Sequence, residues 1–163
     1  MSLASVRAFF THRAPDIEVI ELPVATATVA LAAQAHGVEP GRIAKTLSLR
    51  VGEQAMLVVA RGDSRLDNRK LKTLFGGKAK MLDADTVLAL TGHPVGGVCP
   101  FGLATPLPVY CDIGLREFDE VLPAAGGLHT AVRIAPLRLA ELVGATWVDV
   151  CEGSRPSMPT RTS

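Results

Sequence analysis

Hydrophobic and polar residues alternate with period two over residues 43–51 (IAKTLSLRV), the pattern of a strand with one apolar face. A second apolar run, QAMLVVA at 54–60, follows after a turn at residues 51–53. Because this connection has the length of a hairpin turn, the two segments predict a pair of antiparallel strands.

Helices are predicted where capping residues enclose apolar residues at helical spacing. Each predicted helix begins at Ser, Thr, Asp or Pro, and most end at Gly, which favours the left-handed conformation that closes a helix. The predicted boundaries are Ser2 to Pro15, Thr26 or Thr28 to Gly37, Asp67 to Gly76, Asp83 to Gly92, and Pro136 to residue 143.

Further strands are predicted at 17–22, 78–82, 107–112, 120–122, 129–135 and 146–150, with a short helical turn near 115–118. Turns of hairpin length between several neighbours exclude a purely parallel, doubly wound sheet. The chain of 163 residues fits one domain. We therefore expect an α+β fold with a mixed sheet and flanking helices over residues 1–152, and a flexible tail at 153–163.

Composition restricts the core and the compartment. Hydrophobic residues make up 48% of the chain but aromatic residues only 4%, which indicates an aliphatic core. The sequence has no signal peptide and no apolar run long enough to cross a bilayer, so a cytoplasmic protein is expected. Cys99, Cys111 and Cys151 have no zinc or redox spacing, so reduced structural thiols are predicted.

Lys45 interrupts the apolar face of the predicted strand 43–51. A lysine that points into an apolar layer needs an anion, a cavity or the rim of the sheet. The alternative is a lysine whose ammonium reaches water at the end of a strand.

Charge is unevenly distributed, although the net charge is only +1. Residues 61–80 contain seven Lys and Arg (Arg61, Arg65, Arg69, Lys70, Lys72, Lys78 and Lys80) and two Asp, which gives +5 and leaves −4 for the remainder. This segregation is typical of a surface that faces phosphates, and equally of a solvated helix face.

The segment GHPVGGVCPFG (92–102) is too rich in glycine and proline for a helix or a central strand. Its backbone N–H groups can point at one spot, which suits an oxyanion or a phosphate. No GK[ST] follows it, and no nucleophile elbow or HExxH pair occurs in the chain. A plain structural turn is the alternative.

Three segments together resemble the YbaK/ProX family of trans-editing deacylases, which includes the editing insertion of bacterial prolyl-tRNA synthetases. They are RIAKTLSLR around Lys45, the loop GHPVGGVCPFG, and GGLHTAVRIAPLRLAEL near the end of the chain. The similarity extends from residue 17 to residue 150. It implies a mixed, mainly antiparallel, barrel-like sheet with flanking helices.

The resemblance also implies a reaction, which is hydrolysis of the ester of misacylated transfer RNA, often proline transfer RNA that carries Ala, Cys or 2-aminobutyrate. It assigns a catalytic role to Lys45 and to the loop at Gly96, where the N–H groups of Gly96, Gly97 and Val98 would stabilise the oxyanion. No metal or other cofactor is implied. The implied partner is misacylated tRNA, with a synthetase as an open second partner and neither DNA nor a membrane.

The remaining candidate residues divide into two groups. Residues expected to line the substrate pocket are Thr46, His93, Cys99, Pro100, Gly102 and His129. Those expected to bind tRNA are Arg61, Arg65, Arg69, Lys70 and Lys72. His129 resembles a histidine of alanine-directed relatives, and an ordinary strand histidine is the alternative.

Two other functions stay open at this point. A non-catalytic adaptor of the same fold would bind tRNA or a synthetase without turnover. A small-molecule esterase would act on aminoacyl esters without RNA, and its activity would be insensitive to salt.

Overall fold

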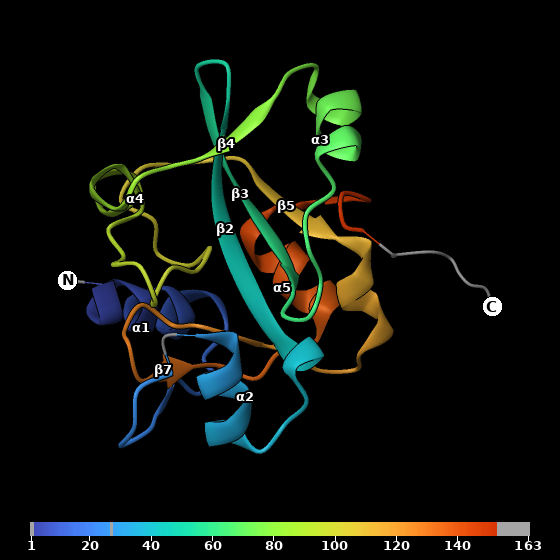
Figure 1. Cartoon of the computed structure of the whole chain (residues 1–163). Coiled ribbons are helices and arrows are strands. Elements are labelled where there is room, and N and C mark those ends of the chain that lie inside the picture. Colours follow the sequence, from blue (N-terminus) through green and yellow to red (C-terminus); the bar gives the residue numbers. More distant parts are fainter. Residues whose placement is uncertain (1, 27, 153–163) are drawn as a thin grey trace.

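The computed structural model describes residues 2–26 and 28–152, and a long hairpin forms its centre (Figure 1). Strands β2 (Ile43–Val51) and β3 (Gln54–Arg61) pair antiparallel from Ala44 opposite Arg61 to Val51 opposite Gln54. The hairpin predicted from the alternation is confirmed. The predicted tail lies outside the described residues.

A six-stranded mixed sheet grows from this hairpin in the order β4-β2-β3-β5-β8, with β6 also on β2. The added strands are β4 (Ala79–Met81), antiparallel to β2, and β6 (Leu122–Pro123), β5 (Val109–Asp112) and β8 (Thr146–Val148), which run parallel to their neighbours. The mixed sheet is thus confirmed, and its longest ladder is antiparallel. The path ends at β4 and β8, and the barrel-like closure stays a prediction.

The helices begin and end close to their predicted caps. They are α1 (Ser2–Arg13), α2 (Val29–His36), α3 (Asn68–Phe75), α4 (Ala84–Thr91) and α5 (Pro136–Val143), with 3₁₀ turns η1 (Pro40–Arg42) and η2 (Ile113–Glu117). Thr28, Asp67 and Asp83 accept hydrogen bonds from the first N–H groups of α2, α3 and α4. These side chains satisfy donors that have no partner within the helix.

Strand β3 carries core residues on both faces because its side chains alternate. Leu57 and Val59 pack in one cluster with residues of α1 and α5, whereas Met56 and Val58 pack in another with Leu71 of α3. Figure 1 accordingly shows α1 and α4 to the left of β2 and α3 at the upper right. Helix α2 packs on the end of β2 through a third, smaller cluster.

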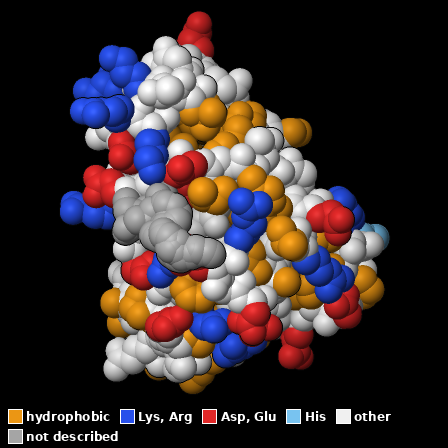
Figure 2. Space-filling model, turned by 90° about the vertical axis from the view of Figure 1, so that its right-hand side faces the viewer, with side chains coloured by type: hydrophobic (Ala, Val, Ile, Leu, Met, Phe, Trp, Pro, Cys, Tyr) orange, Lys and Arg blue, Asp and Glu red, His pale blue; other side chains and the backbone are white. Residues whose placement is uncertain are grey.

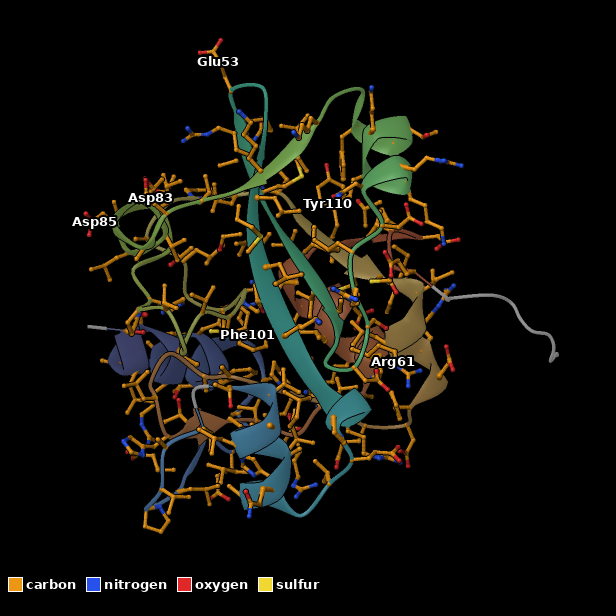
Figure 3. The ribbon with its side chains drawn as sticks, in the orientation of Figure 1. Glu53, Arg61, Asp83, Asp85, Phe101 and Tyr110 are labelled. Atoms are coloured by element: carbon orange, nitrogen blue, oxygen red, sulfur yellow. The ribbon has the colours of Figure 1, made fainter. Side chains whose placement is uncertain are left out.

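Three aromatic rings, those of Phe9, Phe10 and Phe101, meet where α1 contacts the loop that follows α4. The Phe101 ring lies 4.6 Å from that of Phe10 and 5.5 Å from that of Phe9, centre to centre. Figure 3 labels Phe101 in this position beside α1. This contact fixes the loop to the body of the protein.

The predicted strands outside the hairpin are shorter in the structure than expected, as three segments illustrate. The segment 17–22 contributes only β1 (Ile20–Glu21), which pairs with β7 (Thr130–Ala131) from the segment 129–135. The segment 120–122 contributes β6 and a single bridge between Val121 and Ile134. The strand propensity of a segment does not predict how many residues of a neighbouring segment can pair with it. Here the neighbouring segments offer only one or two residues.

No helix within the described residues has the length and apolar character needed to cross a membrane.

Asp112 connects β5, η2 and the C-terminal strand region through two buried hydrogen bonds. Its carboxylate accepts from the N–H groups of Gly114 and Val150, each at 2.9 Å, and the residue is fully buried. We expect Asp112→Ala to lower the free energy of unfolding by about 2–4 kcal/mol, because two buried N–H groups lose a charged acceptor. The exposed Asp119, paired with Arg42, is the control: Asp119→Ala should cost less than about 1 kcal/mol. Equal losses in urea unfolding would contradict this assignment.

Candidate active site

The outer edge of β2 is open at its centre. Strand β6 pairs with Ile43 and Ala44, and β4 pairs with residues 49–51, so residues 45–47 have no strand on this side. The Ser48 carbonyl accepts from the N–H of Leu82 at this edge. Since backbone groups alternate in direction along a strand, the N–H and C=O of Thr46 point to the same open edge.

A cavity of about 320 Å³ lies along this open edge. Its volume is at the lower end of the range of small-molecule sites, about 300–1,000 Å³. The walls are mainly apolar and come from four parts of the chain: α2, the β4–α4 region, the loop after α4, and the β6–β7 region. Representative wall residues are Val29, Ala32, His36, Met81, Leu82, Val87, Val95, Gly96, Val98, Leu122, Ala124, Thr130 and Ala131.

Two residues of the glycine-rich loop that line the cavity have N–H groups without a partner in the described part of the chain. The Gly97 N–H donates to the Pro94 carbonyl at 2.9 Å, so it is occupied. The N–H groups of Gly96 and Val98 have no hydrogen-bond partner within residues 2–26 and 28–152, and both residues line the cavity. Two such donors can stabilise the oxyanion of a tetrahedral intermediate.

Backbone geometry explains why this loop needs glycine. Gly96 has φ +96°, a conformation that strains residues with a side chain. Gly97 lies against the turn at Gly126 and Gly127, where an added Cβ would come within 3.0 Å of both. The Gly97 carbonyl also accepts from the Gly126 N–H at 3.1 Å. The loop is therefore held directly on the second glycine turn.

Lys45 lines the same cavity, but its ammonium is bound elsewhere. It donates to the backbone carbonyls of Ser64 and Gly62, the latter at 3.4 Å, in the turn that follows β3. Burial lowers the pKa of the ammonium from its ordinary value, and the charges of Cys151 and Asp63 act in the opposite direction. The side chain thus lies between the cavity and the start of the basic segment.

Two polar atoms of the cavity residues are buried without a partner in the described part of the chain: His36 Nε2 and Thr46 Oγ1. Burial lowers the pKa of His36, and the positive charge of Arg133 lowers it further. Buried polar atoms normally have hydrogen bonds. Both atoms can therefore help to orient a ligand in this mainly apolar cavity.

Several residues predicted for the pocket lie elsewhere. His93 and Cys99 are fully buried, and both side chains form hydrogen bonds with the Phe101 carbonyl. Burial raises the pKa of the Cys99 thiol to about 12. Pro100 and Gly102 are also absent from the cavity wall, as is Gly97, which lies behind Gly96. The structure brings together Lys45, Thr46, Gly96 and Val98.

His129 and its neighbour exchange the positions expected of them. His129 is exposed, whereas Thr130 is 3% exposed and lines the cavity. The Thr130 hydroxyl bonds to the Gly127 N–H at 2.9 Å. Adjacent residues of a strand point to opposite faces, so an error of one position reverses the assignment.

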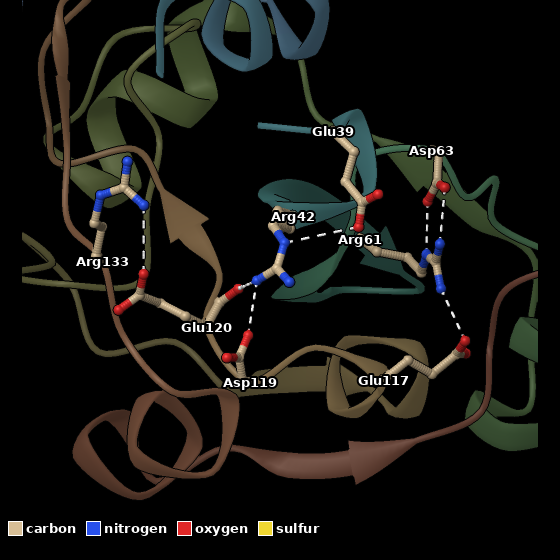
Figure 4. Close-up of polar contacts among 8 residues, drawn as sticks. All are labelled: Glu39, Arg42, Arg61, Asp63, Glu117, Asp119, Glu120 and Arg133. Carbon is tan, nitrogen blue, oxygen red and sulfur yellow. Dashed lines mark hydrogen bonds and ion pairs between the residues drawn. The ribbon is translucent and has the colours of Figure 1, made fainter. Parts of the chain in front are cut away.

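The predicted basic segment is partly neutralised by ion pairs. Arg61 pairs with Asp63 and Glu117, as Figure 4 shows, and its guanidinium stacks on the Phe118 ring. Lys70 pairs with Asp149. On the face drawn in Figure 2, Lys and Arg side chains are interspersed with Asp and Glu. Arg65, Arg69 and Lys72 are exposed and form no ion pair with a described carboxylate.

Wall residues from α2, β6 and β7 were not anticipated from the sequence. Helix α2 is recognisable from Thr28 and Gly37, but its alanine-rich sequence gives no sign of which face meets a cavity. No group of three or more His, Cys, Asp or Glu that could hold a metal occurs in the described ranges.

Comparisons with known proteins show which family the chain resembles. The aminoacyl-tRNA editing domain matches residues 23–142. The uncharacterized protein YwhH of Bacillus subtilis is 46% identical over 154 residues, which cover 93% of this chain and 98% of that protein. The proline–tRNA ligase of Desulfovibrio desulfuricans is 31% identical over 141 residues, 86% of this chain but only 24% of the ligase.

Solved structures are similar as well. The crystal structure of a candidate trans-editing enzyme for prolyl tRNA synthetase has a TM-score of 0.87 and 38% identity, and the match covers 93% of this chain and 98% of that one. The sequence and structural similarities extend over nearly the whole chain. The protein therefore belongs to the aminoacyl-tRNA editing domain family and shares its α+β fold.

Proposed function

We propose that this protein hydrolyses the ester bond of misacylated tRNA. The observation that carries the proposal is the pair of free N–H groups at Gly96 and Val98, on the wall of a cavity beside the open edge of β2. Membership of the editing-domain family supports the same reaction.

The reaction needs only positioning and charge stabilisation. A water molecule attacks the ester carbonyl carbon, and the carbonyl oxygen becomes an oxyanion that accepts hydrogen bonds from Gly96 and Val98. The bond from carbon to the ribose oxygen then breaks, and the ribose oxygen takes the proton that the water gives up. The products are the free amino acid and the uncharged tRNA. An ester is already activated, so orientation of the water supplies much of the remaining acceleration.

Lys45 contributes a positive charge to this centre. In the resting structure its ammonium is held by the carbonyls of Ser64 and Gly62. A phosphate or ribose oxygen of the terminal adenosine is a stronger acceptor than a neutral carbonyl, so a bound substrate can draw the side chain into the cavity. Lys45 would then orient the end of the tRNA.

The cavity suits a small aminoacyl group. Val29, Ala32 and Leu122 give it apolar walls, and Thr46 and His36 give it hydrogen-bonding atoms. Several relatives are proline–tRNA ligases, so the proposed substrate is tRNA(Pro) that carries Ala, Cys or 2-aminobutyrate. The exposed His129 has no place in this pocket, and Thr130 takes the wall position instead. A methylene group changes binding by only about 1–3 kcal/mol, so overlapping substrates are expected.

The tRNA-binding surface is proposed around Arg65, Arg69 and Lys72. These exposed cations are free of described carboxylates, whereas Arg61 and Lys70 are committed to ion pairs. Arg65 follows directly after Ser64, the residue that holds Lys45. The proposed RNA surface thus begins where the catalytic lysine is anchored.

The first test measures release of free amino acid from mischarged tRNA. We expect wild type to release it, and Lys45→Ala to do so about 100-fold more slowly with an unchanged thermal midpoint, because a charge that orients the substrate is removed. Lys78→Ala, which removes an exposed lysine from the same basic segment, is the control. An adaptor without turnover would give no release by wild type and would contradict the proposal.

The second test concerns the loop donors. Gly96→Ala should reduce kcat by about 100- to 1,000-fold, because a side chain at φ +96° displaces the N–H groups that stabilise the oxyanion. Gly52→Ala is the matched control, since Gly52 has φ +60° in the hairpin turn and open space around it. Both variants should lose a similar small amount of stability. Equal kcat values in the two variants would refute the role of the loop.

The third test concerns the cations. Double replacement of Arg69 and Lys72 by Ala should raise KM for mischarged tRNA and leave kcat unchanged. The salt dependence of log(kcat/KM) should become shallower by about one unit of slope for each phosphate that the variant no longer binds. An aminoacyl ester without RNA should be hydrolysed equally by wild type and variant. An RNA-independent esterase would instead show no salt dependence with either substrate.

A further inference from the structure

The first turn of α1 lies against both glycine turns of the site. The Ser2 hydroxyl is 2.6 Å from Nδ1 of His93 and in close hydrogen-bond contact with the Gly126 carbonyl. An added Cβ at Gly126 would lie 2.8 Å from the Ser2 carbonyl oxygen, and one at Gly102 would lie 2.7 Å from that of Ser5. The helix and the turns therefore meet backbone to backbone.

His93 occupies the start of the glycine-rich loop and binds to its far end. Its Nε2 lies 2.7 Å from the Phe101 carbonyl, and its N–H donates to the Thr91 hydroxyl at 3.0 Å. The side chain is fully buried, with the Cys99 thiol 3.6 Å from Nε2. The imidazole thus closes the segment 93–101 into a ring that contains Gly96 and Val98.

The hydrogen-bond partners determine which nitrogen carries the proton. A carbonyl oxygen only accepts, so Nε2 of His93 is the donor to Phe101. In the neutral ring Nδ1 is then an acceptor, and it faces the Ser2 hydroxyl at 2.6 Å. The Ser2 hydroxyl has one proton, which it can give to Nδ1 or to the Gly126 carbonyl. Burial lowers the pKa of His93, which favours the neutral ring.

We propose that Ser2 and His93 are positioning residues that set the direction of the Gly96 and Val98 N–H groups. The loop is held from two sides: His93 holds its ends, and Gly126, which Ser2 contacts, donates to the carbonyl of Gly97 between the two donors. Neither side chain lines the cavity, so both act through the loop. This inference rests on the proposed hydrolysis.

A small displacement of the loop is sufficient to affect catalysis. Oxyanion donors act at 2.7–3.1 Å from the oxygen that develops charge. Donors that are displaced by about 1 Å lose much of their stabilising effect on the transition state. The donors bind the transition state more strongly than the ground state, so a loosened loop lowers kcat and leaves KM nearly unchanged.

Variants of the two serines in the first turn of α1 test this inference. Ser2→Ala should lower kcat about tenfold with KM within about twofold of wild type, because the hydrogen bond to His93 is removed. Ser2→Thr, which keeps the hydroxyl, should restore kcat to within about threefold. Ser5→Ala is the matched control: the Ser5 hydroxyl donates to the Ser2 carbonyl at 2.8 Å, and among the described residues it has no hydrogen bond to the loop. It should cost similar stability and leave kcat unchanged.

A measurement independent of turnover accompanies the kinetics. Nitrogen NMR of the histidine side chains should show His93 with its proton on Nε2, and Ser2→Ala should shift the Nδ1 resonance while Ser5→Ala does not. Equal kcat in Ser2→Ala and Ser5→Ala, or an Nδ1 signal insensitive to Ser2, would overturn the inference. Absence of hydrolysis by wild type would instead refute the proposed function.

Discussion

Backbone pairing along β2 is the constraint on which the rest of this structure depends. One edge of the strand is fully paired with β3, and the other is paired only at its two ends, by β6 and β4. Unpaired backbone groups at a sheet edge must be covered or given a partner. Here helices and a loop cover the edge without filling it, and a cavity results. The cavity therefore lies where the sheet is incomplete, at Lys45 to Leu47.

Close contacts between backbones hold the glycine-rich loop in place beside that cavity. Gly97 packs on Gly126 and Gly127, and Gly126 packs on the first turn of α1. Glycines allow these approaches because they have no Cβ, and the contacts leave little freedom for the loop. The N-terminal helix thus has a second role besides closing the core through Val6 and Phe10. Its first turn packs on Gly126 through Ser2 and on Gly102 through Ser5.

The partners of the cationic side chains distinguish those that support the fold from those that can bind a substrate. Arg61 and Arg42 both stack on the Phe118 ring and pair with carboxylates, as Figure 4 shows for the ion pairs. Their charges are already compensated within the protein. Lys45 instead donates only to neutral carbonyls, so its charge stays available to an anion. The two arginines thus differ from Lys45 because their partners are carboxylates and those of Lys45 are backbone carbonyls.

The sequence by itself determined the local elements, because their causes are local. Helix caps such as Asp67 and Gly76 act on their own helix, and the alternation in 43–51 identified both the hairpin and the anomalous Lys45. Only the tertiary structure decided which residues reach the cavity. His93 and Cys99 became buried, Thr130 replaced His129, and α2 supplied a wall, since these outcomes depend on packing between segments far apart in the chain. Burial and direction of a side chain are properties of such contacts, and no local pattern encodes them.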